Sequence, residues 1–352
     1  PKLIKMLREL IKKDGEWRKL KYEMDRLKAR RNELSNEIAK MKRQGKDVSK
    51  KLKEAKNIPK EIDKISEQMK KLQSRCRNLL MRLPNLLHES VPYGKDENDN
   101  VEIRRVGKQP KFDFEPKDHL TILKGLGLID DERAAKVAGH GFFYLKGKLA
   151  ILDHALQRFA VDHMLSYGFT LVEPPFMMRR KPYEGVTSLD DFEDVLYKIE
   201  KEDLHLIATS EHPLAAMFMD EVLNLDDLPI KVCGISPCFR KEVGAHGKYT
   251  KGLYRMHQFN KIEQFVFCKP EESWDWHEKL QNITEDLLKK LGIYYRVVNI
   301  CTGDIGIIAA KKYDVEFWMA DGKFRELTSC SNSVSYTHLR AHETRHDLVC
   351  RL

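Results

Sequence analysis

The first 83 residues carry apolar side chains at alternating steps of three and four residues, in two runs. The first run is Trp17, Leu20, Met24, Leu27, Arg31, Leu34, Ile38 and Met41, with one Arg among them, and the second is Ile58, Ile62, Ile65, Met69, Leu72, Cys76, Leu79 and Leu83. Such stepping places one apolar seam along a helix and is typical of coiled coils. Because a polar break at residues 44–49 separates the runs, we predict helices over 1–45 and 49–82 that form an antiparallel coiled-coil hairpin.

Three further expectations concern this hairpin. Ser49 should cap the second helix, and Pro59 should kink that helix or remove one of its backbone hydrogen bonds. At 1.5 Å per residue the hairpin should be roughly 50 Å long. Two helices with one seam each cannot enclose a globular core, so residues 1–83 should form a domain of their own.

Basic residues concentrate in the same segment. Residues 1–83 hold 27 Lys and Arg against 12 Asp and Glu, a net charge of +15 within a chain whose net charge is +9. One explanation is a lysine-rich arm that is merely well solvated, and the other is a polyanionic partner such as nucleic acid. An excess of this size on a long exposed element favours the polyanion.

Composition excludes several protein classes. The 352 residues contain no apolar run long enough to span a membrane, and the N-terminal Pro1-Lys-Leu-Ile-Lys lacks the apolar region of a signal peptide. The seven cysteines are odd in number and include no Cys-x-x-Cys, which argues against a disulfide framework and fits a reducing cytosol. We therefore expect a cytoplasmic protein without a membrane partner. The start at Pro rather than Met indicates that a few residues are missing.

Residues 84–135 look like a linker that leads into a globular domain over 136–332. A polar loop at 93–100 is the clearest mark of the linker. Beyond it, the patterns predict helices over 149–167 and 273–291, and strands over 169–173, 204–208, 294–301 and 324–328. Helices packed on antiparallel strands make an α+β fold.

Residues 237–263 point to a functional site. Pro237-Cys-Phe-Arg-Lys-Glu242 and Tyr254-Arg-Met-His-Gln-Phe-Asn-Lys-Ile-Glu263 read as two strands joined by a Gly-rich loop. Side chains alternate across a strand, so the second strand should present on one face Arg255, His257, Phe259, Lys261 and Glu263. Such a face is not ordinary core, and arginine side chains grip phosphate and carboxylate groups. A hairpin with a ladder of salt bridges is the simpler alternative.

These residues also carry a resemblance to a known family. Phe239-Arg-Lys-Glu242, the loop from Gly244 to Gly252 and Arg255-Met-His-Gln-Phe-Asn-Lys-Ile-Glu263 resemble the second signature motif of class II aminoacyl-tRNA synthetases, in its seryl-tRNA synthetase version. The similarity extends from about residue 1 to Asn332. It implies a coiled-coil tRNA-binding arm over 1–83 and a class II catalytic domain, built on an antiparallel sheet, over 136–332. The unit formed by helix 149–167, strand 169–173 and Pro174-Pro175 is similar to the first class II motif, which lies at the dimer interface.

The resemblance also implies site residues. Arg240 would be the catalytic residue that holds the serine carboxylate beside the α-phosphate of ATP, with an ion pair to Glu242 as its alternative role. Phe259 would stack on adenine rather than fill a core position. The implied serine-binding residues are Thr209, Ser210, Glu211, Arg240 and Glu263, although Thr209-Ser-Glu211 also reads as a helix N-cap. The implied ATP-binding residues are Arg240, Lys241, Glu242, Arg255, Met256, Phe259, Glu326, Leu327, Thr328 and Ser329.

Within that set, Glu326-Leu-Thr-Ser329 resembles the family's Glu-x-x-Ser segment, which binds ATP through Mg²⁺. A carboxylate, a hydroxyl and phosphate oxygens suit that ion. The implied partners are serine, ATP and tRNA-Ser, with tRNA-Sec as a further candidate, together with a second copy of the chain. Neither DNA nor a membrane is expected as a partner.

The resemblance stops after Asn332. Residues 333–352 look like an unrelated tail in place of the segment that carries the third class II motif, so we expect an incomplete catalytic domain and little activity. The tail contains His342-Glu-Thr-Arg-His346, a formal His-Glu-x-x-His zinc signature. Because such a helix needs a third ligand and a surrounding scaffold, we expect no zinc here.

The leading functional prediction is therefore a serine–tRNA ligase, which activates serine with ATP and transfers it to tRNA. A catalytically inactive tRNA-binding fragment of such an enzyme is the first alternative. A coiled-coil interaction protein with a degenerate globular half is the second, and the intact motif at 237–263 argues against it.

Overall fold

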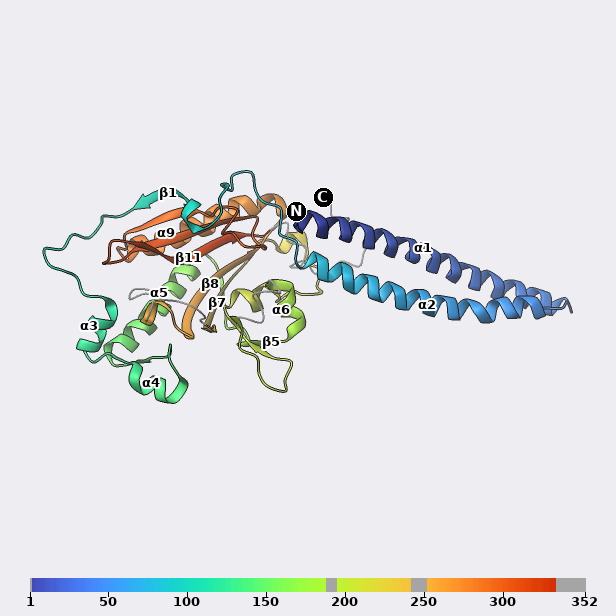
Figure 1. Cartoon of the computed structure of the whole chain (residues 1–352), viewed down its shortest axis with the longest axis horizontal. Coiled ribbons are helices and arrows are strands. Elements are labelled where there is room, and N and C mark those ends of the chain that lie inside the picture. Colours follow the sequence, from blue (N-terminus) through green and yellow to red (C-terminus); the bar gives the residue numbers. More distant parts are fainter. Residues whose placement is uncertain (1, 188–194, 242–251, 334–352) are drawn as a thin grey trace. The chain divides into compact units, whose positions relative to one another are not determined.

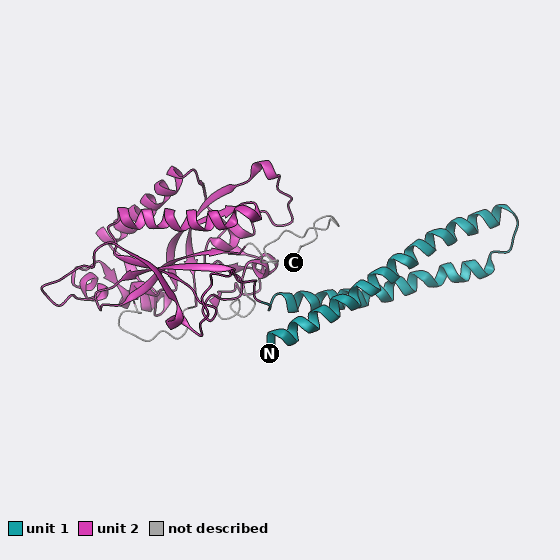
Figure 2. Cartoon of the chain, turned by 90° about the horizontal axis from the view of Figure 1, so that it is seen from above, with its two compact units in different colours: residues 1–83 teal, residues 84–352 magenta. Residues whose placement is uncertain are grey.

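The computed structural model describes residues 2–187, 195–241 and 252–333. The chain divides into two compact units, Pro1–Leu83 and Pro84–Leu352, which are drawn in different colours in Figure 2. Figure 1 labels the helices and strands of both units. No helix in the described ranges combines the length and the apolarity needed to cross a membrane.

The first unit is the predicted antiparallel helical hairpin, hereafter the arm. It consists of α1 (Lys2–Arg43) and α2 (Ser49–Leu80), and α2 runs uninterrupted through Pro59. Ion pairs between the helices fix their opposite direction, because Arg30 pairs with Glu54 near the turn and Arg75 with Glu9 at the other end. The seam is confirmed by its buried members, which are Leu34, Ile58, Ile65, Met69 and Leu79.

Two expectations for the arm are wrong in detail. Arg31 falls on a seam step but is exposed, because a guanidinium in this narrow contact would lose its water without gaining a partner. Ser49 does not cap α2: its position is the first helical residue, and Asp47 Oδ1 accepts hydrogen bonds from both the backbone N and the Oγ of Ser49. The carboxylate two residues earlier therefore stabilises this turn.

The second unit contains a sheet with the strand order β1-β9-β10-β11, in which every pair is antiparallel. Its strands are β1 (Val101–Val106), β9 (Tyr295–Asn299), β10 (Lys311–Trp318) and β11 (Phe324–Asn332). Residues 84–135 are therefore more than a connector, since β1 forms one edge of this sheet and the backbone N of Asn85 donates to the carbonyl of Ile307 over 2.7 Å.

A second sheet has the strand order β4-β7-β8, and one helix packs against both sheets. It is formed by β4 (Thr170–Val172), β7 (Ile230–Phe239) and β8 (Gln258–Phe267); β4 is parallel to β7, and β7 is antiparallel to β8. Helix α9 (Ser273–Lys290) contacts both sheets: Gln264 of β8 donates to the carbonyl of Leu280, and the ring of His277 hydrogen-bonds the carbonyl of Cys330 in β11. Helix α5 (Lys148–Ser166) packs on β7 and β8 (Figure 1). The predicted α+β class is confirmed.

Shorter elements complete the second unit. The helices are α3 (His119–Gly125), α4 (Asp131–Ala138), α6 (Arg180–Val186) and α8 (Glu211–Ala215), and the short strand pairs are β2 (Ile129–Asp130) with β3 (Tyr144–Leu145) and β5 (Met177–Met178) with β6 (His205–Leu206). The 3₁₀ turns are Glu97–Asp99, Leu225–Asp227, Gly252–Tyr254 and Pro270–Glu272. Between β6 and α8 the chain crosses the end of β7, where the candidate site lies.

Candidate active site

The antiparallel pair β7–β8 provides the floor of the candidate site. The ladder runs from Ile230 opposite Phe267 to Phe239 opposite Gln258, so β8 presents Phe259, Lys261 and Glu263 on one face, as predicted. The prediction is wrong for the residues before Gln258: Arg255 and His257 precede the strand and follow the Gly252–Tyr254 turn. The ladder ends there because the chain leaves β7 at Phe239.

Arg240, the predicted catalytic residue, lies immediately beyond β7 and is held by backbone on two sides. Its N donates to the carbonyl of His257 over 3.0 Å, and its Nε donates to the carbonyl of Ala208 over 3.2 Å. Its guanidinium lies 5.1 Å from the centroid of the Phe259 ring. The guanidinium therefore rests on the ring that the sequence assigns to adenine, and it is fixed at the end of the Phe259–Glu263 face. Glu242, the alternative partner, lies outside the described residues.

Thr209 and Glu263 meet across two elements that are distant in sequence. Thr209 is buried in the turn before α8, and its Oγ1 donates to Glu263 Oε2 over 3.1 Å. Lys261 Nζ lies 2.8 Å from the same carboxylate oxygen. Thr209 Oγ1 also accepts from the backbone N of Glu211, so the N-cap alternative is correct in part: one hydroxyl both holds the turn and contacts Glu263.

The charges at this point are balanced. The Glu211 side chain reaches solvent but is crowded by protein, and burial together with the nearby Glu263 carboxylate raises its pKa. Burial disfavours the charged form of Lys261, but Glu263 and Glu211 outweigh burial and raise the pKa of Lys261. Two carboxylates, one ammonium and the Arg240 guanidinium thus surround one small region. Such a set can take up a zwitterion, with carboxylates for its ammonium and a guanidinium for its carboxylate.

Glu326 and Ser329 lie on one face of β11 although they are three residues apart. In a regular strand such residues point to opposite faces. Here Val315 pairs with Thr328 and the next residue, Glu316, pairs with Glu326, so Leu327 is a β-bulge that restores the shared face. Ser329 Oγ donates to Glu326 Oε1 over 3.1 Å. The bulge gives the Glu-x-x-Ser spacing a physical reason that the sequence did not supply.

Asp314, on β10 opposite Ser329, joins this group and was missed by sequence reasoning. It is only 5% exposed, and its Oδ1 has no hydrogen-bond partner in the described part of the chain. Burial raises its pKa to about 6 against the opposing effect of Lys312, whose Nζ lies 3.4 Å from Asp314 Oδ2. Lys312 also opposes the rise in the pKa of Glu211, so this group lies within electrostatic reach of the Thr209–Glu263 cluster. Its oxygens suit a hard divalent cation.

The remaining predicted residues have more varied positions. The backbone N of Lys241 donates to the carbonyl of Val195 over 2.8 Å, Met256 is half-buried, and Arg255 and Leu327 are exposed. His257 is held by two aromatic neighbours. Its ring stacks on Phe142 with 5.1 Å between the ring centroids, and its Nδ1 lies 2.6 Å from the hydroxyl of Tyr197. The residues that the structure brings together are thus Thr209, Glu211, Arg240, Phe259, Lys261 and Glu263, with Asp314, Glu326 and Ser329 beside them.

Comparisons with known proteins agree with this geometry. Residues 2–87 match the seryl-tRNA synthetase N-terminal domain, and residues 195–343 match the tRNA synthetase class II core domain (G, H, P, S and T). A serine–tRNA ligase of Methanoregula boonei is 54% identical over 337 residues, which cover 96% of this chain and 79% of that protein.

Solved structures give the same result. The crystal structure of seryl-tRNA synthetase from Pyrococcus horikoshii complexed with ATP superposes with a TM-score of 0.88 at 48% identity, covering 96% of this chain and 80% of that one. The cytoplasmic serine–tRNA ligase of Naegleria fowleri, in complex with AMP, gives a TM-score of 0.81 at 31% identity and covers 96% and 81% of the two chains. With an identity above one half over nearly its whole length, this chain belongs to the seryl-tRNA synthetase family of class II aminoacyl-tRNA synthetases.

Proposed function

We propose that this chain is a serine–tRNA ligase, which joins serine to ATP as seryl-adenylate and then transfers the seryl group to tRNA-Ser. The observation that carries the proposal is the convergence of Arg240, Thr209, Glu211 and Glu263 at the end of the β7–β8 pair. Relatives that share half of its residues are serine–tRNA ligases. tRNA-Sec is a second candidate acceptor by resemblance.

Serine would bind through both of its charges and its hydroxyl. The Glu211 and Glu263 carboxylates can accept from the ammonium group and the hydroxyl, while Thr209 and Lys261 hold Glu263 in place. Discrimination follows from this arrangement, because alanine would leave a buried polar group of the pocket without its partner.

Adenylate formation requires two anions to meet. A carboxylate oxygen of serine attacks the α-phosphorus, the bond from that phosphorus to the bridging oxygen breaks, and pyrophosphate leaves with the electron pair. The protein contributes mainly position and positive charge. Arg240 is fixed through Nε and lies on Phe259, so its terminal nitrogens can bridge carboxylate and phosphate at the end of the strand face. Movement of Arg240 off Phe259 would expose that ring to adenine.

We assign Mg²⁺ to the group on β10 and β11. Glu326 and Ser329 would hold the ion together with ATP oxygens, and Asp314, whose Oδ1 is buried without a described partner, would face it. A divalent ion held by these residues would supply positive charge beside the triphosphate.

Glu326→Ala should remove the contribution of Mg²⁺ to ATP affinity. Magnesium should strengthen ATP binding to the unaltered chain by about tenfold or more and to the variant by less than about twofold. Calorimetric titration of ATP with and without MgCl₂ measures both. Glu132→Ala removes an exposed carboxylate of α4, so it is the matched control and should keep the full magnesium effect. Equal magnesium effects in the two variants would rule out the assignment.

The function itself is tested by ATP–pyrophosphate exchange with serine, alanine or threonine. Because the sequence predicts little activity without the third class II motif, the assay uses the chain with residues 333–352 replaced by the C-terminal segment of a seryl-tRNA synthetase. Exchange should depend on serine, and a tRNA-Ser transcript should then accept labelled serine. Binding of tRNA-Ser without any serine-dependent exchange would contradict ligase activity and favour a catalytically inactive tRNA-binding protein.

Two further proposals concern the oligomeric state of the protein and its location in the cell. We propose a homodimer through α5 and β4, the elements that resemble the first class II motif. The apolar side chains Ile151, Leu152 and Leu156 of α5 are each at least 44% exposed in the single chain, and Leu171 of β4 is 40% exposed. We also propose a cytoplasmic location, in line with the free cysteines of the described residues.

A further inference from the structure

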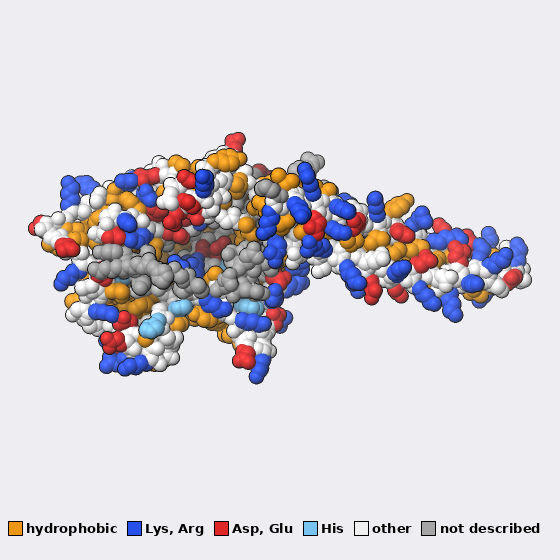
Figure 3. All heavy atoms as spheres, in the orientation of Figure 1, with side chains coloured by type: hydrophobic (Ala, Val, Ile, Leu, Met, Phe, Trp, Pro, Cys, Tyr) orange, Lys and Arg blue, Asp and Glu red, His pale blue; other side chains and the backbone are white. Residues whose placement is uncertain are grey.

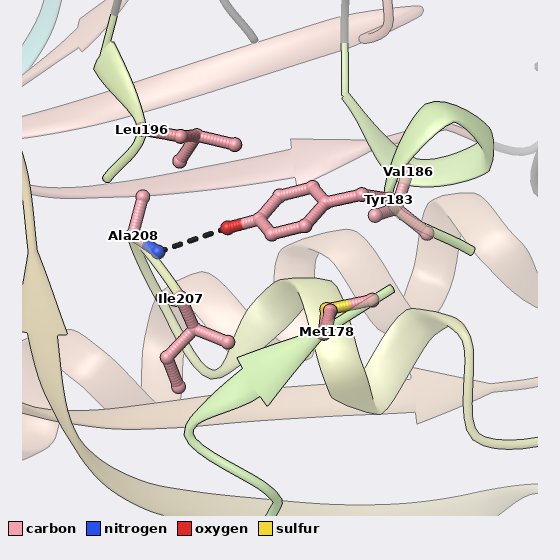
Figure 4. Close-up of a cluster of buried hydrophobic side chains, with 6 residues drawn as sticks. All are labelled: Met178, Tyr183, Val186, Leu196, Ile207 and Ala208. Atoms are coloured by element: carbon pink, nitrogen blue, oxygen red, sulfur yellow. Dashed lines mark hydrogen bonds between the residues drawn. The ribbon is translucent and has the colours of Figure 1, made fainter. Parts of the chain in front are cut away.

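A buried tyrosine that no motif includes lies directly behind the predicted serine-binding turn. Tyr183 belongs to α6, its side chain is 0% exposed, and it packs in a cluster with Met178, Val186, Leu196 and Ile207. Figure 4 shows that its ring extends through this cluster toward Ala208 and that its hydroxyl meets the backbone N of that residue. The ring is therefore surrounded by apolar side chains, while its hydroxyl has a hydrogen-bond partner, as buried tyrosine hydroxyls usually do.

The hydroxyl contacts both ends of the turn that carries Thr209 and Glu211. On one side the backbone N of Ala208 donates to Tyr183 Oη over 3.0 Å, and on the other Tyr183 Oη lies 3.0 Å from His212 Nδ1. Burial lowers the pKa of His212 to about 3, with Lys261 and Arg240 adding to the effect, so the imidazole is neutral. Its Nδ1 can therefore accept the hydroxyl proton of Tyr183, at a shorter distance than the other acceptor nearby, the carbonyl oxygen of Leu206 at 3.4 Å.

Thr209 Oγ1 holds the turn from within by accepting from the backbone N of Glu211, but the neighbouring serine adds no such support. Ser210 is the N-cap of α8 but its side chain makes no cap hydrogen bond, and its Oγ is buried with no partner in the described ranges. The backbone of Ala208 links two groups: its N–H is held by Tyr183 and its carbonyl by Arg240 Nε. A shift of this residue would therefore move the serine-binding turn and Arg240 together.

We propose that Tyr183 is a positioning residue for serine, whose hydroxyl brackets residues 208–212 and so fixes Thr209 and Glu211 against Glu263 and sets the resting place of Arg240. The inference rests on the proposed function. It does not require Tyr183 to touch the substrate, since its side chain is fully buried.

Tyr183→Phe tests this by removing one oxygen while the ring stays in the cluster. The probe is 5′-O-(N-seryl-sulfamoyl)adenosine, a stable analogue of seryl-adenylate, titrated calorimetrically into the full chain, with ATP titrated separately. Leaving the Ala208 N–H and His212 Nδ1 unpaired should weaken binding of the analogue by roughly tenfold and binding of ATP by less than about twofold. A merely structural role would weaken both ligands together, or neither.

Tyr295→Phe is the matched control. Tyr295 lies on β9 and is also 0% exposed, and its hydroxyl donates to Glu285 of helix α9 rather than to the serine-binding turn. This variant should lower the melting temperature while preserving the ratio of analogue affinity to ATP affinity. A change in that ratio as large as the one for Tyr183→Phe would overturn the proposal, as would an unchanged ratio in Tyr183→Phe.

A second pair of variants keeps the test decisive if Tyr183→Phe does not fold. His212→Leu removes the acceptor of the Tyr183 hydroxyl, whereas His212→Asn supplies an amide oxygen in its place. The leucine variant should lose analogue affinity selectively and the asparagine variant should recover most of it; equal affinities in the two would overturn the proposal. If the unaltered chain binds ATP but not the analogue, the proposed function fails first, and this inference fails with it.

Discussion

Replacing Arg240 with alanine should abolish serine-dependent ATP–pyrophosphate exchange. Arg240 is the cation held at the end of the Phe259–Glu263 face by Ala208 and His257. Its removal leaves the approaching carboxylate and phosphate without a shared donor, and the transition state should lose on the order of 3 kcal/mol or more, about a hundredfold in rate. The exchange assay measures this loss at saturating ATP and serine, with the substitution made in the chain that carries a seryl-type C-terminal segment in place of residues 333–352.

Two variants separate charge from geometry. Arg240→Lys keeps the positive charge but loses the planar pair of donors, so it should recover only a minor part of the rate. Arg133→Ala removes an exposed arginine that pairs with Asp130, far from the β7–β8 floor in sequence and structure, and it should leave the rate unchanged. A drop under about threefold in Arg240→Ala would remove this residue from the mechanism.

Much of the fold was predictable because local patterns decided it. The seam of the arm required only 3–4 stepping, and α5, α9 and β9 appeared near their predicted bounds. The strand β10 was not predicted. Its central residues Tyr313, Asp314 and Val315 are all buried, so it lacks the alternation that marks a strand with one solvent face.

The site was predictable as far as it coincided with a motif. Arg240, Phe259 and Glu263 lie where the motif implied, but the bulge at Leu327 and the carboxylate of Asp314 depend on pairing between strands, which one sequence does not reveal. Tyr183 was missed for the same reason, since its hydroxyl partners lie 25 and 29 residues away along the chain. Glu242 and the zinc-like residues His342 and His346 lie outside the described residues, so the predictions about them stay predictions.

Deleting residues 1–83 should abolish measurable binding of tRNA-Ser while serine and ATP binding stay nearly intact. These residues form a compact unit with a net charge of +15, and Figure 3 shows Lys and Arg side chains along the length of both helices. Phosphate contacts release counterions, so the logarithm of the affinity should fall steeply and linearly with the logarithm of the salt concentration in the full chain. Filter binding or fluorescence anisotropy between about 50 and 200 mM salt measures both quantities.

A charge-neutralising set tests the same idea without removing the arm. The variant changes four exposed lysines of the arm to glutamine, namely Lys28, Lys42, Lys53 and Lys60. Each lost phosphate contact removes about one released ion, so the slope of log affinity against log salt should fall in magnitude by roughly three. Binding of tRNA-Ser should weaken at least tenfold. The matched control is the same change at four exposed lysines of the second unit, Lys108, Lys111, Lys136 and Lys201. Residues 84–352 carry a net charge of −6, so they attract the tRNA phosphates little. The control set should therefore weaken tRNA binding less than threefold. Equal losses in the two sets, or a deletion variant that binds tRNA-Ser with the affinity and salt slope of the full chain, would mean that the arm does not bind the tRNA.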